Sequence, residues 1–121
     1  FMKANAQREE VTVTDSGLQY EVLESGSGDT PGPQSTVVTH SHGTLVDGTV
    51  FDSSVQRGQP AEFGVNQVIP GWTEALQLMS VGDKWRIACP PQLAYGDQGA
   101  GDAIPPDTAL VFEIHLIEIK D

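Results

Sequence analysis

The sequence predicts an α+β fold, in which an antiparallel sheet of about five or six strands carries one short helix against one face. Short β-prone runs, separated by turns rich in Gly, Pro, Ser and Asp, occupy most of the chain. Residues 68–79 are the exception, because their apolar side chains recur at the spacing of one helix face, at Trp72, Ala75, Leu76 and Met79. A single short amphipathic helix cannot bury its apolar side alone, so it must lie against the sheet.

The β-prone runs are bounded by turn residues, and these boundaries set the expected order of the strands. The runs are residues 11–14, 18–24, 36–46, 49–51, 61–65, 84–89 and 108–119. Asp47-Gly48, between the third and fourth runs, is typical of a β-hairpin. Residues 25–34 and 52–60 have loop composition, and the second segment is expected to interrupt its strand as a bulge. Residues 1–10 are predicted to be frayed or helical.

The expected helix has recognisable ends. Pro70 suits the first turn, where a missing backbone N–H costs nothing, and Gly82 ends the pattern. The loop at 92–107 is much longer than the usual connection of about 4–6 residues, and loops of that length are commonly functional. In the last strand, alternate positions share one face, at Leu110, Phe112, Ile114 and Leu116.

Composition excludes several classes of protein. The 121 residues are enough for about one domain. With 17 acidic and 6 basic residues the net charge is −11, which argues against binding to nucleic acid or to anionic lipid. The sequence contains no apolar run of the length, about 20 residues, that a membrane span requires. Cys89 is the only cysteine and is expected to be a small buried hydrophobe.

The polar residues give little support to covalent or metal chemistry. Ser41, Ser53 and Ser54 lie near histidines in sequence, but no Gly-x-Ser-x-Gly elbow surrounds them, which favours serines that bond to the local backbone. His40 and His42 share one strand face and His115 could add a third nitrogen. Two histidines without a second close pair are a weak metal signal, so no metal site is predicted.

An apolar site is the remaining possibility. Phe51, Phe63, Trp72 and Tyr95 lie at loops or element ends, and Asp52 directly follows Phe51. Scattered aromatic residues usually form the core, but Tyr95 lies in a long loop rich in Gly and Pro. A pocket lined by aromatic rings and edged by one hydroxyl and one carboxylate fits ligand recognition better than bond cleavage.

Five motifs make this interpretation specific. They are Gly48-Thr-Val-Phe-Asp-Ser-Ser54, Val68-Ile-Pro-Gly-Trp72, Leu93-Ala-Tyr-Gly96, Ile104-Pro-Pro106 and Leu110-Val-Phe112. In this order and spacing they closely resemble the FKBP-type peptidyl-prolyl cis-trans isomerases, over about residues 17–120. The segments that begin at Ser16 and Pro70 resemble the bacterial macrophage-infectivity-potentiator (Mip) subgroup of that family.

The resemblance implies a twisted antiparallel sheet wrapped around the short helix, with the substrate pocket between them. It assigns catalytic roles to Phe51, Asp52, Trp72, Tyr95 and Phe112. It assigns substrate binding to Ser41, Arg57, Phe63, Val68, Ile69 and Ile104. In this scheme Trp72 is the floor of the pocket, the three Phe rings are its walls, and Val68, Ile69 and Ile104 form its rim. The Ile69 N–H and the Tyr95 hydroxyl would donate to substrate carbonyls, and Arg57 would pair with Asp52.

The implied activity is isomerisation of X–Pro bonds in protein folding, which needs no nucleophile, metal or cofactor. Proline-containing polypeptides would be the substrates and macrolides the inhibitors. Two departures stand out, because the family usually has Tyr where this chain has Ser41, and many relatives have a larger apolar residue at Ala61. The alternative is therefore a binding module or chaperone for proline peptides or macrolides, weakened in catalysis by Ser41. A metal-handling protein that uses the three histidines is a third hypothesis.

The subgroup resemblance also predicts domain organisation. Residues 1–16 would be the C-terminal end of a connecting helix and its linker, and residues 17–121 the isomerase domain. Proteins of the subgroup carry an N-terminal helical dimerisation region, so a homodimer is expected through a region upstream of Phe1. The compartment is not predicted from the residues, and the subgroup implies the periplasm or cytoplasm of a bacterium.

Overall fold

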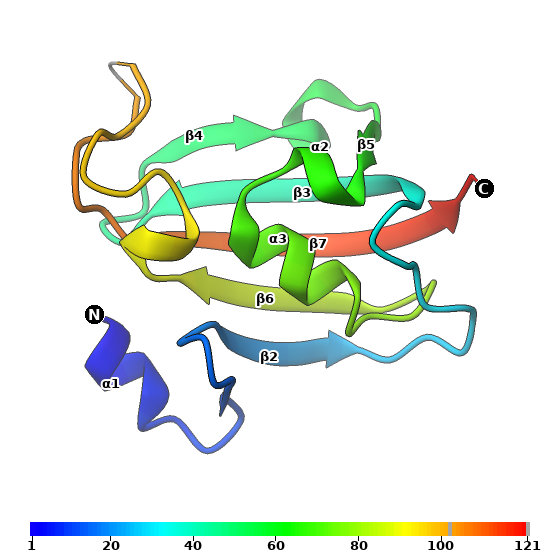
Figure 1. Ribbon diagram of the computed structural model, residues 1–121, viewed down its shortest axis with the longest axis horizontal. Coiled ribbons are helices and arrows are strands. Elements are labelled where there is room, and N and C mark those ends of the chain that lie inside the picture. Colours follow the sequence, from blue (N-terminus) through cyan, green and yellow to red (C-terminus); the bar gives the residue numbers. More distant parts are fainter. Residues whose placement is uncertain (102, 121) are drawn as a thin grey trace.

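In the part of the chain that the structure describes, seven strands form one antiparallel sheet, and helix α3 lies across one of its faces (Figure 1). The computed structural model describes residues 1–101 and 103–120. Residue 102 of the predicted loop 92–107, and residues 102 and 121 of the predicted domain 17–121, lie outside the described residues. The strands are β1 (Thr12–Val13), β2 (Gln19–Glu24), β3 (Thr36–Leu45), β4 (Val50–Ser53), β5 (Ala61–Gly64), β6 (Lys84–Cys89) and β7 (Leu110–Ile119). Their order is β1-β2-β6-β7-β3-β4, with β5 also paired to β3. The predicted fold class is confirmed.

The strand count exceeds the expected five or six. The two-residue β1 is a full member of the sheet, paired with Gln19 and Tyr20 of β2. Strand β5 resumes β4 after the interruption, as the sequence predicted, because it pairs with β3 from Thr39–Ala61 to Thr36–Gly64, beyond the last β4 rung at His42–Ser53. The long β3 therefore contacts β4 and β5 along one edge and β7 along the other.

The helices agree with the prediction at two places and differ at a third. Helix α3 spans Pro70–Leu76, α1 (Met2–Ala6) lies in the segment that was predicted to be frayed or helical, and α2 (Ser54–Arg57) was not predicted. Single 3₁₀ turns occur at Val65–Gln67 and Pro91–Leu93. The prediction that residues 52–60 form a loop with a bulge was wrong. Ser53 caps α2 by accepting a hydrogen bond from the Gln56 N–H, and Gly58 ends it with a left-handed φ of 76°.

The predicted apolar side of α3 forms the centre of the core. Trp72 is 5% exposed, and Ala75, Leu76 and Met79 are fully buried. They pack with side chains of β6 and β7 that point to the same sheet face, which include Ile87, Leu110, Phe112 and Ile114. The α-helix itself ends at Leu76, earlier than the predicted Met79. The helix therefore acts as the sequence predicted, through one apolar side laid on the sheet.

Gly71 allows α3 to approach β6 very closely. A Cβ atom at Gly71 would lie 2.4 Å from the Cys89 Sγ and 3.2 Å from the Leu93 carbonyl oxygen. Cys89 is fully buried, as predicted, and burial raises the pKa of its thiol to about 12, with a smaller contribution from the Glu74 carboxylate. The thiol is therefore protonated at neutral pH and acts as a packing atom rather than as a nucleophile.

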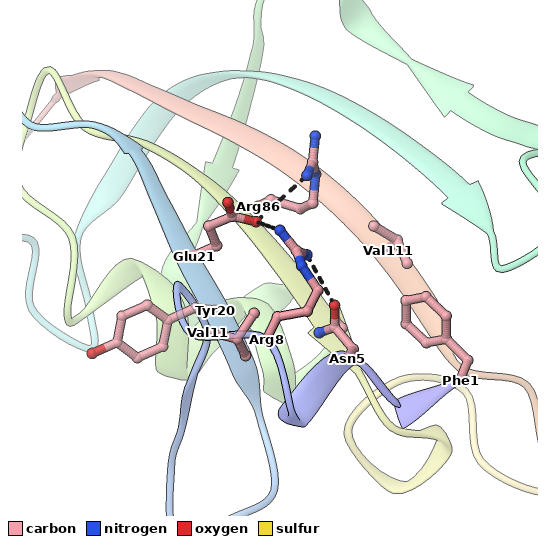
Figure 2. Close-up of a pocket in the computed structure, with 9 residues that line it drawn as sticks. Phe1, Asn5, Arg8, Val11, Tyr20, Glu21, Arg86 and Val111 are labelled. Carbon is pink, nitrogen blue, oxygen red and sulfur yellow. Dashed lines mark hydrogen bonds and ion pairs between the residues drawn. The ribbon is translucent and has the colours of Figure 1, made fainter. Parts of the chain in front are cut away.

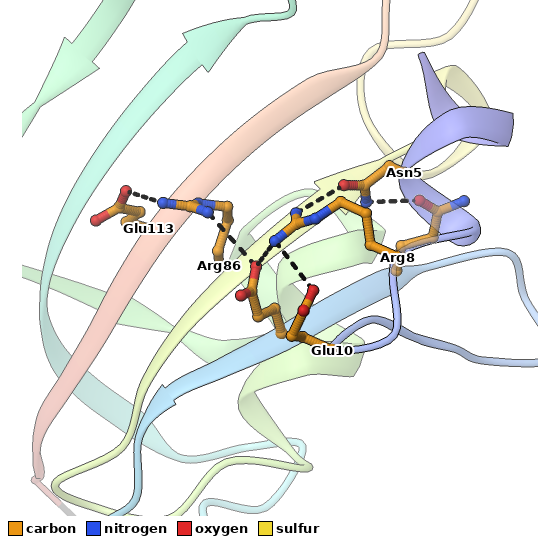
Figure 3. A network of polar contacts seen from close by, with 7 residues as sticks. Asn5, Arg8, Glu10, Arg86 and Glu113 are labelled. Carbon is orange, nitrogen blue, oxygen red and sulfur yellow. Dashed lines mark hydrogen bonds and ion pairs between the residues drawn. The ribbon is translucent and has the colours of Figure 1, made fainter.

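Helix α1 lies on the sheet face opposite α3, and a chain of polar contacts holds it there (Figures 2 and 3). The Asn5 side-chain amide donates to Gln19, and the Gln19 amide donates to the Met2 carbonyl oxygen. The Arg8 guanidinium bonds to Glu21 at 2.9 Å, and Glu21 also contacts Arg86 at 3.4 Å. Arg86 in turn reaches Glu113 at 3.1 Å, so that charges alternate across β2, β6 and β7. This network leaves the α3 face free for a binding site.

We predict that Gly71→Ala destabilises the fold by about 1–3 kcal/mol, as overpacked core substitutions do. An alanine in a helix otherwise favours folding over glycine by about 0.5–1 kcal/mol, so a net loss identifies the clash with Cys89. Urea unfolding measures the change. Because the nearest atom is the Cys89 sulfur, adding Cys89→Ala should recover part of the loss, and strictly additive effects of the two substitutions would contradict the contact.

Candidate active site

A cavity of about 390 Å³ opens between α3, the adjoining sheet face and the loops beside them. Its most buried lining side chains are Ser41, Trp72 and Phe112, which are between 5% and 7% exposed. The complete lining is Ser41, Phe51, Asp52, Phe63, Gln67, Val68, Ile69, Trp72, Tyr95 and Phe112. The cavity thus has aromatic and aliphatic walls with polar groups among them, which is the usual character of a small-ligand or peptide site.

Four aromatic rings form a continuous chain along this cavity. Trp72 makes edge-to-face contacts with Phe63 and Phe112, with ring centroids 5.5 Å and 5.4 Å apart and planes at 74° and 87°. Phe51 contacts Phe112 in the same manner, at 5.5 Å and 86°. The rings come from β4, β5, α3 and β7, so each depends on the packing of a different element. Edge-to-face contacts at these distances are favourable and hold the rings in fixed orientations.

Gly43 provides the space for two of these rings. A Cβ atom at Gly43 would lie 2.7 Å from the Phe51 Cζ and 3.0 Å from two ring atoms of Phe112. Gly43 is opposite Phe112 on β7 and opposite Asp52 on β4, where the β3–β4 register shifts. The missing side chain therefore lets the two rings meet above the β3 backbone.

Three polar groups at the edge of the cavity come from separate parts of the chain. Asp52, at the end of β4, accepts a hydrogen bond of 2.5 Å from the Arg57 guanidinium at the end of α2, and both side chains are half exposed. Tyr95 lines the cavity from the long loop and is 42% exposed. Ile69 precedes α3, and within residues 1–101 and 103–120 its N–H has no acceptor. That N–H can donate to a carbonyl of a bound ligand.

All but two of the residues that the sequence predicted for the site lie along this cavity. Arg57 is not a lining residue, but its bond to Asp52 places it next to the rim. Ile104 is only 4% exposed, and it packs in the core and forms an isolated bridge with Ala100. Ile104 is not among the residues that line the cavity, and its place at the pocket rim stays a prediction. Gln67 lines the cavity and was missed, although it directly precedes the predicted rim residue Val68.

Within the described part of the chain, no three His, Cys, Asp or Glu side chains are grouped so that they could hold a metal ion. His40 and His42 bond instead to Ser54 and Ser53. Of the helices that the structure describes, none is long and apolar enough to span a membrane.

Comparison with known families decides the classification. Residues 28–117 match the model of the FKBP-type peptidyl-prolyl cis-trans isomerases. The chain belongs to this family. Residues 1–22 also match the domain that lies amino-terminal to FKBP-type isomerases.

Individual relatives agree with this assignment. The chain is 56% identical over 119 residues to an FKBP-type 22 kDa peptidyl-prolyl cis-trans isomerase of Escherichia coli, and 50% identical over 120 residues to the outer membrane protein MIP of Legionella longbeachae. These alignments cover 98% and 99% of this chain, but only 58% and 52% of those relatives. The crystal structure of FkpA from Escherichia coli superposes with a TM-score of 0.94 at 42% identity, over 98% of this chain and 55% of that one. The chain is thus a Mip-like member that spans about half the length of the curated relatives it matches.

We predict that Gly43→Ala lowers stability by about 1–3 kcal/mol, because the new Cβ must displace Phe51 or Phe112. The near-ultraviolet circular dichroism of the aromatic chain should weaken at the same time. Urea unfolding and circular dichroism measure the two effects. Gly32→Ala is the matched control, since its Cβ would meet only the Ser35 Oγ, at 3.9 Å. Equal behaviour of the two variants would contradict the role of Gly43.

Proposed function

We propose that the chain is a peptidyl-prolyl cis-trans isomerase that accelerates X–Pro isomerisation in protein folding without covalent chemistry. The observation that carries this proposal is the aromatic cavity around Trp72, edged by Asp52, the Ile69 N–H and Tyr95, in a chain of this family. The reaction rotates one amide bond over a barrier of about 18–20 kcal/mol and breaks no bond. A site for it therefore needs shape and polarity rather than a nucleophile.

The aromatic walls can lower that barrier by disfavouring the planar amide. Resonance makes the planar form more dipolar than the twisted transition state, so a dry cavity lined by Trp72, Phe51 and Phe112 favours the twisted form. Each tenfold acceleration requires about 1.4 kcal/mol of such differential binding. Proline is the apolar ring that a pocket of this kind accommodates.

The polar groups at the edge would orient the peptide. The Ile69 N–H and the Tyr95 hydroxyl would donate to carbonyl groups on either side of the proline, which would hold the substrate bent. Asp52 would contact the carbonyl region beside the rotating bond, and its pairing with Arg57 limits the net charge that this contact introduces. Phe63, Val68 and Gln67 would contact the residue that precedes proline. No cofactor is required for these steps.

The partners and the organisation of the whole protein follow from the same proposal. Proline-containing polypeptides are the substrates, and macrolides that mimic a bent proline amide compete for the cavity. Residues 1–16 are the end of a connecting helix and linker, and residues 17–121 form the isomerase domain. The short α1 and the match of residues 1–22 to the amino-terminal domain support this division. A homodimer would form through a region upstream of Phe1.

A protease-free isomerisation assay with short peptides tests the activity. We expect catalysed cis-to-trans conversion that is fastest when an apolar residue precedes proline, and that a macrolide of the FKBP inhibitor class abolishes. The peptide alone gives the uncatalysed rate. If the protein binds macrolide and peptide but the peptide isomerises only at the uncatalysed rate, the proposal is contradicted. The chain would then be a binding module.

We predict that Ser41→Tyr raises kcat/KM and strengthens macrolide binding. Ser41 is a buried lining residue, and its side chain is too short to form an aromatic wall beside Phe51. A tyrosine ring would exclude water and bring a hydroxyl within reach of Asp52, and each such contact is worth about 0.5–1.5 kcal/mol, or roughly two- to tenfold in kcat/KM. Peptide isomerisation and macrolide titration measure the change. If kcat/KM does not rise, the idea that Ser41 lowers activity by leaving the pocket without an aromatic wall at this position is contradicted.

A further inference from the structure

Two histidines on the sheet face opposite the cavity bond to two consecutive serines at the junction of β4 and α2. The His40 Nδ1 lies 2.9 Å from the Ser54 Oγ, and the His42 Nδ1 lies 2.9 Å from the Ser53 Oγ. Both histidines alternate along β3 with the cavity residue Ser41, so their rings are on the other face of the sheet. The proposed isomerase mechanism assigns no role to either ring.

Ser54 continues the β3–β4 ladder beyond its last backbone pair. Strand β4 pairs with β3 as far as the rung His42–Ser53, and the chain then enters α2. At the next position the Ser54 hydroxyl accepts a hydrogen bond of 2.8 Å from the Ser41 N–H and donates one of 3.3 Å to the Ser41 carbonyl oxygen. Ser54 is fully buried, so its hydroxyl holds the backbone of a cavity-lining residue.

These bonds favour one direction for the contact with His40, which depends on the tautomer of its ring. A serine hydroxyl has one proton and two acceptor lone pairs. The Ser54 proton goes to the Ser41 carbonyl oxygen, and one lone pair accepts the Ser41 N–H. With that arrangement an acceptor site remains for the His40 Nδ1, which would carry a proton and donate to Ser54 at 2.9 Å. The structure therefore assigns His40 the Nδ1–H tautomer.

The second pair restrains the same junction. Ser53 is the N-cap of α2, where its Oγ accepts the Gln56 N–H at 3.2 Å. The bond from His42 fixes that cap against β3. Asp52 immediately precedes Ser53, and Arg57 is the last residue of α2, so the clamped junction separates the two partners of the ion pair at the cavity.

We propose that His40 and His42 are positioning residues of the isomerase site. Through Ser54 and Ser53 they hold the β4–α2 junction, and with it the Asp52–Arg57 pair and the backbone of Ser41. This inference rests on the proposed function. Loss of either ring lets the junction move, and a displaced Asp52 affects the rotating bond more than it affects binding of the peptide, because the aromatic walls remain in place.

The test uses His40→Leu, His42→Leu and His40→Asn, with His115→Leu as the matched control. His115 lies opposite His40 on the same sheet face and is exposed. We expect each histidine-to-leucine change at 40 or 42 to lower kcat about tenfold with little change in KM, as misplacement of a group that acts at the transition state does. Asparagine places an amide N–H where His40 carries its Nδ1–H, so His40→Asn should restore kcat. His115→Leu should retain the wild-type rate.

Nuclear magnetic resonance tests the clamp without relying on turnover. Long-range ¹H–¹⁵N spectra should show the Nδ1–H tautomer for neutral His40, and the Arg57 side-chain resonances should shift in His40→Leu but not in His115→Leu. A Nε2–H tautomer at His40, or unchanged Arg57 resonances, would overturn the proposal. Wild-type kcat in His40→Leu, or failure of asparagine to rescue it, would do the same. If the wild-type protein shows no turnover, the isomerase proposal fails, and the tautomer and the Arg57 resonances still decide the clamp.

Discussion

The close contact between Gly71 and Cys89 determines how deep the helix lies in the fold. Gly71 has no side chain, so α3 packs closer to β6 than any Cβ would allow, because that atom would lie 2.4 Å from the Cys89 sulfur. That depth places Trp72 against Phe112 of β7 and leaves Ile69, at the start of the helix, among the residues that line the cavity. A helix held farther from the sheet would separate the indole from the phenylalanine rings. The aromatic site is thus a consequence of helix–sheet packing rather than of a specialised loop.

The two faces of the sheet differ in polarity and in what they bind or hold in place. The α3 face carries the apolar core and the cavity, whose polar groups are few and lie among the aromatic walls. The opposite face carries polar contacts: the charges that join Arg8 to Glu113 and hold α1, and the two imidazoles that reach the β4–α2 junction. Chemistry that depends on a dry pocket benefits from this separation, because charged groups strengthen the fold without entering the site.

Most of the site was predictable from the sequence because its residues lie in short motifs at regular elements. The periodicity from Trp72 to Met79 predicted the helix face, and the motif resemblance placed nearly all lining residues. Helix α2 was missed because its Ser, Gln and Gly composition is that of a loop, although Ser53 and Gln56 have capping-box spacing. Ile104 packs in the core, and its burial follows no periodic pattern in a loop rich in Gly and Pro. The histidine–serine bonds depend on where β4 leaves the sheet, which no local pattern specifies.

The most direct test of the account is exchange spectroscopy of a Phe-Pro peptide in the presence of the ¹⁵N-labelled protein. One sample then reports both the isomer exchange rate and the residues that the peptide contacts. We expect cis–trans exchange to be far faster than the uncatalysed reaction, which takes tens to hundreds of seconds. The shifted protein signals should include the Trp72 indole, the Ile69 amide and the Tyr95 amide. Uncatalysed exchange, or shifts confined to the α1 face of the sheet, would contradict the claim that the aromatic cavity beside α3 is an isomerase site.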